Sequence, residues 1–364
     1  MHRYTTAAAL LCLGSTTHAQ PFAHTYPDPG QMTQRSAMVD TLRTRLDIAR
    51  PWMRTESGLA MADAVETLPP RTRRWRWSTP SFGERTYTME QRDALDIEDK
   101  RLIEFFGISE FVYYAGWSSD APLIEFRAFD LAMHGTPLAD PSGLAGARVL
   151  IVDPGVITSA WALARLGADV TVVSHSQRFR AIYNSPSDRG AVNGLNGGPA
   201  GSVTIVDANW PSDLTPDLAG PFDLIVAVNV LNVGRTDPTP GQGRDNRAPN
   251  PLKPLDIPHE IVTERLAGAL AQGGRAIIYN WGSPIRPNAN PNPESDVRVL
   301  IEPHLASKAG LEPTAFASDA SVFTRLLAGR AQMPDVRRQI DAEGLSAPQI
   351  SAFYAIYDKP GAEN

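Results

Sequence analysis

The chain has 364 residues, a formal net charge of −6 and 42% hydrophobic residues. This length accommodates one domain of about 200 residues and a further portion. The mildly acidic balance, without a long basic run, argues against nucleic acid as a partner. The sequence also contains no apolar stretch near the roughly 18 residues of a transmembrane helix.

The first twenty residues have the layout of a cleavable secretory signal. A basic start precedes a short apolar region from Ala7 to Leu13, and a small, polar end follows, with cleavage expected after Ala19. We therefore expect residues 1–19 to be a signal peptide and the protein to be periplasmic or secreted. A disordered tail or an organellar presequence is the alternative. The only cysteine, Cys12, lies in this segment, so the mature chain is expected to lack disulfides and cysteine-based sites.

Residues 20–145 are expected to form a helical N-terminal extension that covers the sheet domain. Apolar spacing of the helical period predicts helices at Ser36–Ile48, Glu56–Thr67, Met89–Phe106 and Ile124–Met133, with a short strand at Phe111–Tyr114.

Within this extension, arginines cluster with Trp75 and Trp77 between Arg71 and Tyr87. We interpret the cluster as a strand or arm whose tryptophans pack on the main domain while the arginines stay solvated. The alternative is a patch that binds an anion, a glycan or a membrane surface through charge and aromatic stacking.

Residues 146–360 open with the stretch RVLIVDPGVITSAWALARLGADVTVVSHS. It predicts a buried strand at Arg148–Asp153, a helix at Ser159–Leu166 and a second buried strand at Val170–Val173. Thr158 or Ser159 is expected to be the helix N-cap, and Gly167 the residue just past its end. This arrangement is typical of the first crossover of a Rossmann-like sheet. The turn before the helix is where such sheets bind nucleotides, because helix N-terminal amides favour polar or anionic groups.

The remaining elements are predicted in the following order: helix Gln177–Tyr183, loop Asn184–Gly201, strand Val203–Asp207, strand Phe222–Val228, long loop Gly234–Pro258, helix His259–Ala271, turn Gly273–Gly274, strand Arg275–Tyr279, loop Ser283–Ser295, helix Val297–Ala309, strand Leu311–Ala317, helix Ala320–Ala342 and strand Ser351–Asp358.

Five phrases in this order carry a resemblance to a known fold. They are the strand–turn–helix–strand unit above, SVTIVDANW, FDLIVAVNVL, LAGALAQGGRAIIYNWG and AFYAIYDKP. Together they resemble the class I S-adenosylmethionine-dependent methyltransferases over about residues 145–360. The resemblance implies an α/β, doubly wound, Rossmann-like sheet that is mostly parallel, with the last strand antiparallel beside strand five. It also implies S-adenosylmethionine as the cofactor and a small molecule as the partner.

The cofactor motif after the first strand matches this family in part. The family commonly has D-x-G-x-G-x-G, and Asp153 and Gly155 match its acidic residue and first glycine. Ile157 stands at the second glycine, where a β-branched side chain is bulky and poorly suited to unusual backbone angles. The turn is therefore degenerate relative to the family.

The ends of the next strands supply the other expected ligand contacts. Strand two ends at Ser174, where the family usually has a carboxylate for the ribose hydroxyls. Asp207 matches the acidic residue that the family places near the adenine amino group, and Asn229 lies where motif residues face the methyl group and the substrate. Losing the ribose carboxylate removes charge-assisted hydrogen bonds of about 1.5–3 kcal/mol each, which predicts weak binding.

Three functions remain open from the sequence. The first is an exported methyltransferase-fold protein that works as a non-enzymatic binding module. The second is an active S-adenosylmethionine-dependent methyltransferase with a divergent turn. The third is an NAD(P)-dependent Rossmann oxidoreductase, although the turn lacks G-x-G-x-x-G. The sequence identifies no catalytic residue, and its scattered histidines, of which His175 lies nearest the ligand edge, predict no metal site.

Overall fold

The computed structural model describes residues 36–71, 74–78, 86–87, 93–101, 104–116, 121–183, 186–229, 231, 257–282, 301–329 and 351–361. All described residues belong to one compact unit, Thr33–Asn364. The expected signal peptide, the 234–256 part of the long loop, the loop at 283–295 and residues 330–342 of the predicted late helix lie outside the described residues. So do the side chains of Trp75 and Trp77.

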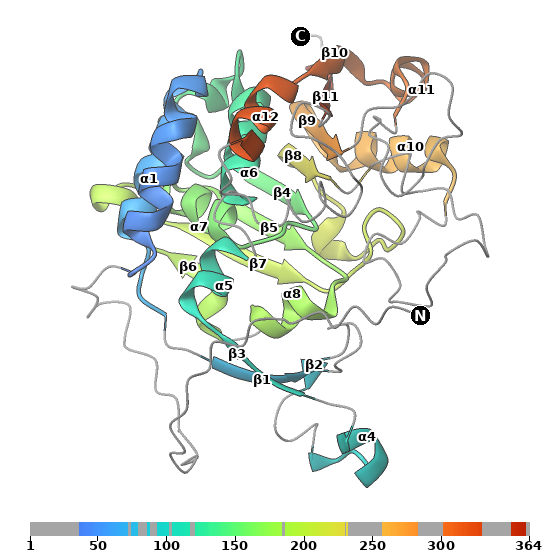
Figure 1. Cartoon of the computed structure of the whole chain (residues 1–364). Helices are drawn as coiled ribbons and strands as arrows, with labels where there is room; N and C mark the ends of the chain where they lie inside the picture. Colours follow the sequence, from blue (N-terminus) through green and yellow to red (C-terminus); the bar gives the residue numbers. More distant parts are fainter. Residues whose placement is uncertain are drawn as a thin grey trace. The chain divides into compact units, whose positions relative to one another are not determined.

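An eight-stranded sheet forms the centre of the fold, with the strand order β10-β11-β9-β8-β4-β5-β7-β6 (Figure 1). Its strands are β4 (Arg148–Val152), β5 (Asp169–Val173), β6 (Gly190–Val192), β7 (Gly201–Val206), β8 (Phe222–Val228), β9 (Leu270–Gly282), β10 (Glu312–Asp319) and β11 (Ser351–Asp358). Strands β7, β5, β4, β8 and β9 pair in parallel, whereas β11 runs antiparallel between β9 and β10. The predicted mostly parallel sheet with an antiparallel last strand is confirmed.

Helices flank this sheet and precede it. They are α1 (Val39–Ala49), α2 (Glu56–Ala64), α4 (Ile97–Arg101), α5 (Glu110–Ala115), α6 (Ala121–Met133), α7 (Thr158–Arg165), α8 (Gln177–Ile182), α10 (His259–Ala269), α11 (Pro303–Lys308) and α12 (Ser321–Gly329). Short 3-10 helices are η2 (Arg50–Trp52), η3 (Val65–Thr67), η4 (Pro137–Ala139), η5 (Pro141–Leu144), η6 (Pro186–Asp188), η7 (Leu195–Gly197) and η8 (Pro216–Leu218). No helix in the described ranges is long and apolar enough to cross a membrane.

Alternating strand residues divide the buried core between the two faces of the sheet. Val149 and Ile151 of β4 belong to one hydrophobic cluster, whereas Leu150 and Val152 belong to the other. Residues of α10 and α11 join the second cluster. Because both faces are covered, the central strands are apolar at nearly every position.

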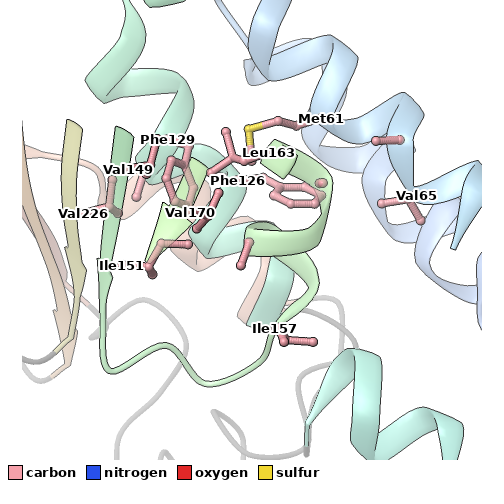
Figure 2. Packing of buried hydrophobic residues seen from close by; sticks show 14 of the residues in the cluster. Met61, Val65, Phe126, Phe129, Val149, Ile151, Ile157, Leu163, Val170 and Val226 are labelled. Atoms are coloured by element: carbon pink, nitrogen blue, oxygen red, sulfur yellow. The ribbon is translucent and has the colours of Figure 1, made fainter. Parts of the chain in front are cut away.

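The N-terminal helices share the first cluster with the sheet. Met61 of α2 and Phe126 of α6 pack with Leu163 of α7 and with Val170 of β5, as Figure 2 shows. Helix α6 contacts β8 and β9, and α2 contacts α6 and α7. The extension and the sheet therefore share one hydrophobic core, to which both contribute residues.

The extension differs from the prediction in two places. A three-stranded antiparallel sheet, in the order β2-β1-β3, combines β1 (Arg74–Ser78), β2 (Thr86–Tyr87) and β3 (Glu104–Ile108). The helix predicted through Phe106 is therefore wrong at its end, because residues 104–108 pair with β1. The strand predicted at Phe111–Tyr114 is also wrong. Those residues lie in α5, whose first turn is capped by the Ser109 hydroxyl accepting from the Val112 N–H.

Two further differences lie in the sheet domain. The loop predicted at Asn184–Gly201 contains β6, which pairs antiparallel with β7 at the sheet edge. Strand β9 begins at Leu270, so the turn predicted at Gly273–Gly274 is a bulge inside the strand, at the register shift opposite Phe222–Leu224. Gly273 has a positive φ of 76°, which glycine adopts without strain.

Candidate ligand edge and its geometry

The strand order reverses at β4. The chain proceeds from β4 through β5 to β7 on one side, and then returns to β8 on the other side of β4. Open α/β sheets bind ligands outside the carboxyl ends of their strands at such a switch point. We call the residues that follow β4, β5, β7 and β8 the switch-point edge, namely Asp153, Ser174, Asp207 and Asn229.

Asp153 and Asn229 both have left-handed backbones, with φ of 45° and 60°. The Asp153 N–H donates to the carbonyl of Val173 at 2.7 Å, and the Asn229 N–H donates to the carbonyl of Tyr279 at 2.8 Å. The Asn229 Oδ1 also accepts from the Trp281 N–H at 3.3 Å. Aspartate and asparagine tolerate this conformation better than other non-glycine residues, and such outliers gather at functional sites.

The side chain of Asp153 reaches across to the end of β5. Its carboxylate accepts a short hydrogen bond from the Ser174 hydroxyl, which in turn accepts from the Ser176 N–H at 3.2 Å. Burial raises the pKa of the Asp153 carboxyl, while the bond from Ser174 opposes this rise. The structure therefore brings these two predicted residues together, with Ser174 buried at the position where the family has a ribose carboxylate.

Asp207 lies at the exposed end of β7. The Arg180 guanidinium of α8 binds its Oδ2, and His175 Nδ1 lies 3.9 Å from its Oδ1. The side chains of Asp207 and His175 are 50% and 57% exposed to solvent. Asp207 is thus accessible to a ligand, but it already has a cationic partner.

The β4–α7 turn, Asp153–Ile157, is built differently from the expectation. Ile157 has an ordinary helical φ of −84° and its side chain is buried in the core, so it does not obstruct the turn (Figure 2). Gly155 is exposed, and a Cβ added there would meet only Glu125 Oε1, at 3.9 Å. The left-handed residue of the turn is Asp153 itself, so neither glycine position of the family motif is required by the backbone here.

Glu125 of α6 fills the inner side of this turn. Its Oε1 accepts from the Gly155 N–H at 3.2 Å and its Oε2 contacts the Ser159 hydroxyl at 2.5 Å. The Val156 N–H also donates to this carboxyl group. Glu125 is 4% exposed, and burial raises its pKa to about 7 against the effect of these three hydrogen bonds. The donors that usually attract a ligand anion at a helix N-terminus are therefore engaged by the protein itself.

Thr158 and Ser159, the residues predicted to cap α7, bond instead to the neighbouring helices α5 and α6. The N-cap is Ile157, without a side-chain hydrogen bond, so the prediction of Thr158 or Ser159 as the cap is wrong. The Thr158 hydroxyl donates to the Tyr114 carbonyl of α5 at 2.5 Å, and the Ser159 hydroxyl contacts Glu125. Gly167 does follow the helix with a positive φ, as predicted.

The chain resembles known proteins in structure but not in sequence. No protein-family model and no curated protein sequence matches the chain. Among solved structures, the cyclase SpnF is 18% identical, with a TM-score of 0.39 over 60% of this chain and 76% of its own. The N-methyltransferase NodS from Bradyrhizobium japonicum WM9, in complex with S-adenosylhomocysteine, is 11% identical with a TM-score of 0.34 over 64% and 84%. A 1,6-didemethyltoxoflavin-N1-methyltransferase from Burkholderia thailandensis, with bound 1,6-didemethyltoxoflavin and S-adenosylhomocysteine, is 13% identical with a TM-score of 0.32 over 59% of this chain and 72% of its own.

The order and direction of the strands define the class of fold. A parallel sheet reversing at β4, with β11 antiparallel between β9 and β10, is the arrangement that the sequence resemblance implied. The chain has a class I S-adenosylmethionine-dependent methyltransferase-like, Rossmann-like fold. A fold of this kind supports many activities, so the activity depends on the residues of the site.

Proposed function

We propose that this protein binds S-adenosylmethionine at the switch-point edge, as a methyltransferase-like protein of weak cofactor affinity. One observation carries the proposal. The two residues that end the adjacent central strands, Asp153 after β4 and Asn229 after β8, both hold left-handed backbones where the strand order reverses. Strain of this kind persists where a binding geometry needs it.

The side chains of the edge favour S-adenosylmethionine over a dinucleotide. A dinucleotide places its anionic pyrophosphate at the N-terminus of the first crossover helix. In this chain the Gly155 N–H and the Ser159 hydroxyl at that terminus are engaged by Glu125. S-Adenosylmethionine carries no phosphate and has a positively charged sulfonium, which is compatible with an acidic surrounding.

Weak affinity follows from Ser174. Its hydroxyl donates to Asp153, so the end of β5 offers the ribose no carboxylate of its own. Each missing charge-assisted hydrogen bond reduces binding by about 1.5–3 kcal/mol, and about 1.4 kcal/mol corresponds to tenfold in Kd. Among the described residues we assign no catalytic acid or base, so methyl transfer from this edge would depend on proximity and orientation.

Calorimetric titration of the full-length chain with S-adenosylmethionine, S-adenosylhomocysteine and NAD tests this proposal. We expect the first two to bind and NAD not to bind. Asp153→Asn and Asp207→Asn should each raise Kd about ten- to a hundredfold, because each loses a charged acceptor. Asparagine keeps the left-handed backbone at position 153 accessible.

The control variant is Asp217→Asn, an exposed carboxylate of η8, which should leave Kd unchanged. Binding of NAD alone would contradict the proposal and support the alternative function of an NAD(P)-dependent oxidoreductase. A folded sample that binds none of the three ligands would contradict the proposal and leave a binding module for another partner.

A further inference from the structure

Glu125 is a buried acid that forms the contact between the N-terminal extension and the ligand turn. It belongs to α6, yet its hydrogen bonds reach Gly155 and Ser159 on either side of the start of α7. Gly116, at the end of α5, lies against the same turn, since a Cβ added there would come within 3.0 Å of Val156 Cγ1. The turn is therefore exposed on one side and covered by the extension on the other.

The charged groups on the neighbouring elements have partners of their own. On α6, Arg127 pairs with Asp130 at 2.7 Å. In the turn, Asp153 accepts from Ser174, and at the far end of α7 the Arg165 guanidinium lies over the Trp161 ring. On α5 the Glu110 carboxylate accepts from the Arg71 N–H at 2.9 Å, and the hydroxyl of Tyr114 donates to the Pro69 carbonyl. On β9 the Arg275 guanidinium pairs with Asp358 at 2.5 Å. The ionisation of Glu125 is governed by burial and by its three hydrogen bonds.

The uncharged form of Glu125 also has hydrogen-bond partners in this surrounding. Its Oε1 accepts the Gly155 N–H in either state, and a protonated Oε2 donates to the Ser159 hydroxyl oxygen. Only the charged form bears the penalty of a carboxylate held away from water. Glu125 is 4% exposed, so its carboxylate has little access to water while α6 and the turn are in contact.

We propose that Glu125 is a proton-operated clamp on the β4–α7 turn: uncharged, it holds α6 against the turn, and ionised, it loosens this contact and opens the turn amides to solvent. The proposal concerns the turn itself and holds whether or not the edge binds S-adenosylmethionine. It makes access to the amides at the start of α7 dependent on pH.

The sign of the pH dependence follows from the linkage between protonation of Glu125 and opening of the turn. A carboxyl group with a higher pKa in the closed state than in water favours the closed state below its ordinary pKa, and this advantage is lost as pH rises towards about 7. Opening is therefore expected to increase between about pH 5 and pH 7, and to level off above that.

Native-state hydrogen exchange of the Gly155 and Val156 amides in the full-length chain tests the clamp. Rates are divided by the intrinsic exchange rate at each pH. In the native protein we expect the corrected rates to rise about tenfold or more from about pH 5 to pH 7. In Glu125→Gln, whose amide reproduces the uncharged acid, they should not change with pH.

Two further variants complete the test. Glu264→Gln, an exposed position on α10, should follow the native protein. Ser159→Ala keeps the acid but removes a hydrogen bond that favours its charged form, so the rise should continue to a higher pH before it levels off. A flat profile in the native protein, an equal rise in Glu125→Gln, or an unchanged levelling-off pH in Ser159→Ala would overturn the proposal.

Discussion

Replacing Asp130 by alanine is expected to lower the free energy of unfolding by about 3–5 kcal/mol. This carboxylate of α6 is fully buried, and its Oδ1 accepts the N–H groups of Arg54 and Thr55 at 2.8 and 2.9 Å and the Thr55 hydroxyl at 2.9 Å. Its Oδ2 binds the Arg127 guanidinium, itself only 6% exposed, at 2.7 Å. Alanine would leave this cation buried without its counter-charge, and would leave the donors of Thr55 without an acceptor.

The effect should extend to α2, because the Thr55 hydroxyl also accepts from the Gly58 N–H as the N-cap of that helix. Urea unfolding followed by circular dichroism measures the loss. Asp63→Ala is the control, since Asp63 forms an exposed ion pair with Arg50 and should change stability by less than about 1 kcal/mol. Equal effects of the two substitutions would show that Asp130 does not organise the buried cluster.

Glu125→Gln is expected to make the protein more stable than the native chain at about pH 8, with the difference vanishing near pH 4. The folded state raises the pKa of Glu125 from its ordinary value of 4.5 to about 7. The native protein therefore loses stability as pH rises through this window, whereas the glutamine variant does not. With about 1.36 kcal/mol for each pKa unit, the difference at high pH is on the order of 3 kcal/mol.

Thermal or urea unfolding of both proteins across this pH range measures the difference. Glu264→Gln, an exposed substitution of the same kind, should track the native chain at every pH. If Glu125→Gln were less stable at pH 8 than the native protein, the charged carboxylate would be a net stabilising contact of the turn, and the direction of the clamp would be reversed.

The sequence predicted the central sheet well because its strands are fully buried. The bounds of β8 and β11 agree with the predicted ranges, and β4, β5 and β7 differ by one or two residues. Continuous apolar runs between turn residues carry this signal. The same reasoning failed at residues 104–108, where pairing with β1 outweighs the helical spacing, and at β6, whose exposed edge position leaves no apolar pattern.

The switch-point edge could be predicted because the ends of parallel strands can be read from the strands themselves. Asp153, Ser174, Asp207 and Asn229 all lie at strand ends, as expected. Glu125 was missed, since it comes from a helix of the extension and meets Gly155 thirty residues along the chain. A signal was present, because α6 carries three charged residues in an otherwise apolar sequence, APLIEFRAFDLAM. Charges on a buried helix require partners, which points to tertiary contacts.

The location of the ligand is tested most directly by hydrogen exchange of the full-length chain with and without saturating S-adenosylhomocysteine. We expect added protection at Asp153–Ile157, at Ser174–Ser176 and around Asp207 and Asn229, with β6 and β10 at the two ends of the sheet unchanged. Protection confined to those ends, or no change anywhere in the chain, would contradict a ligand site at the point where the strand order reverses.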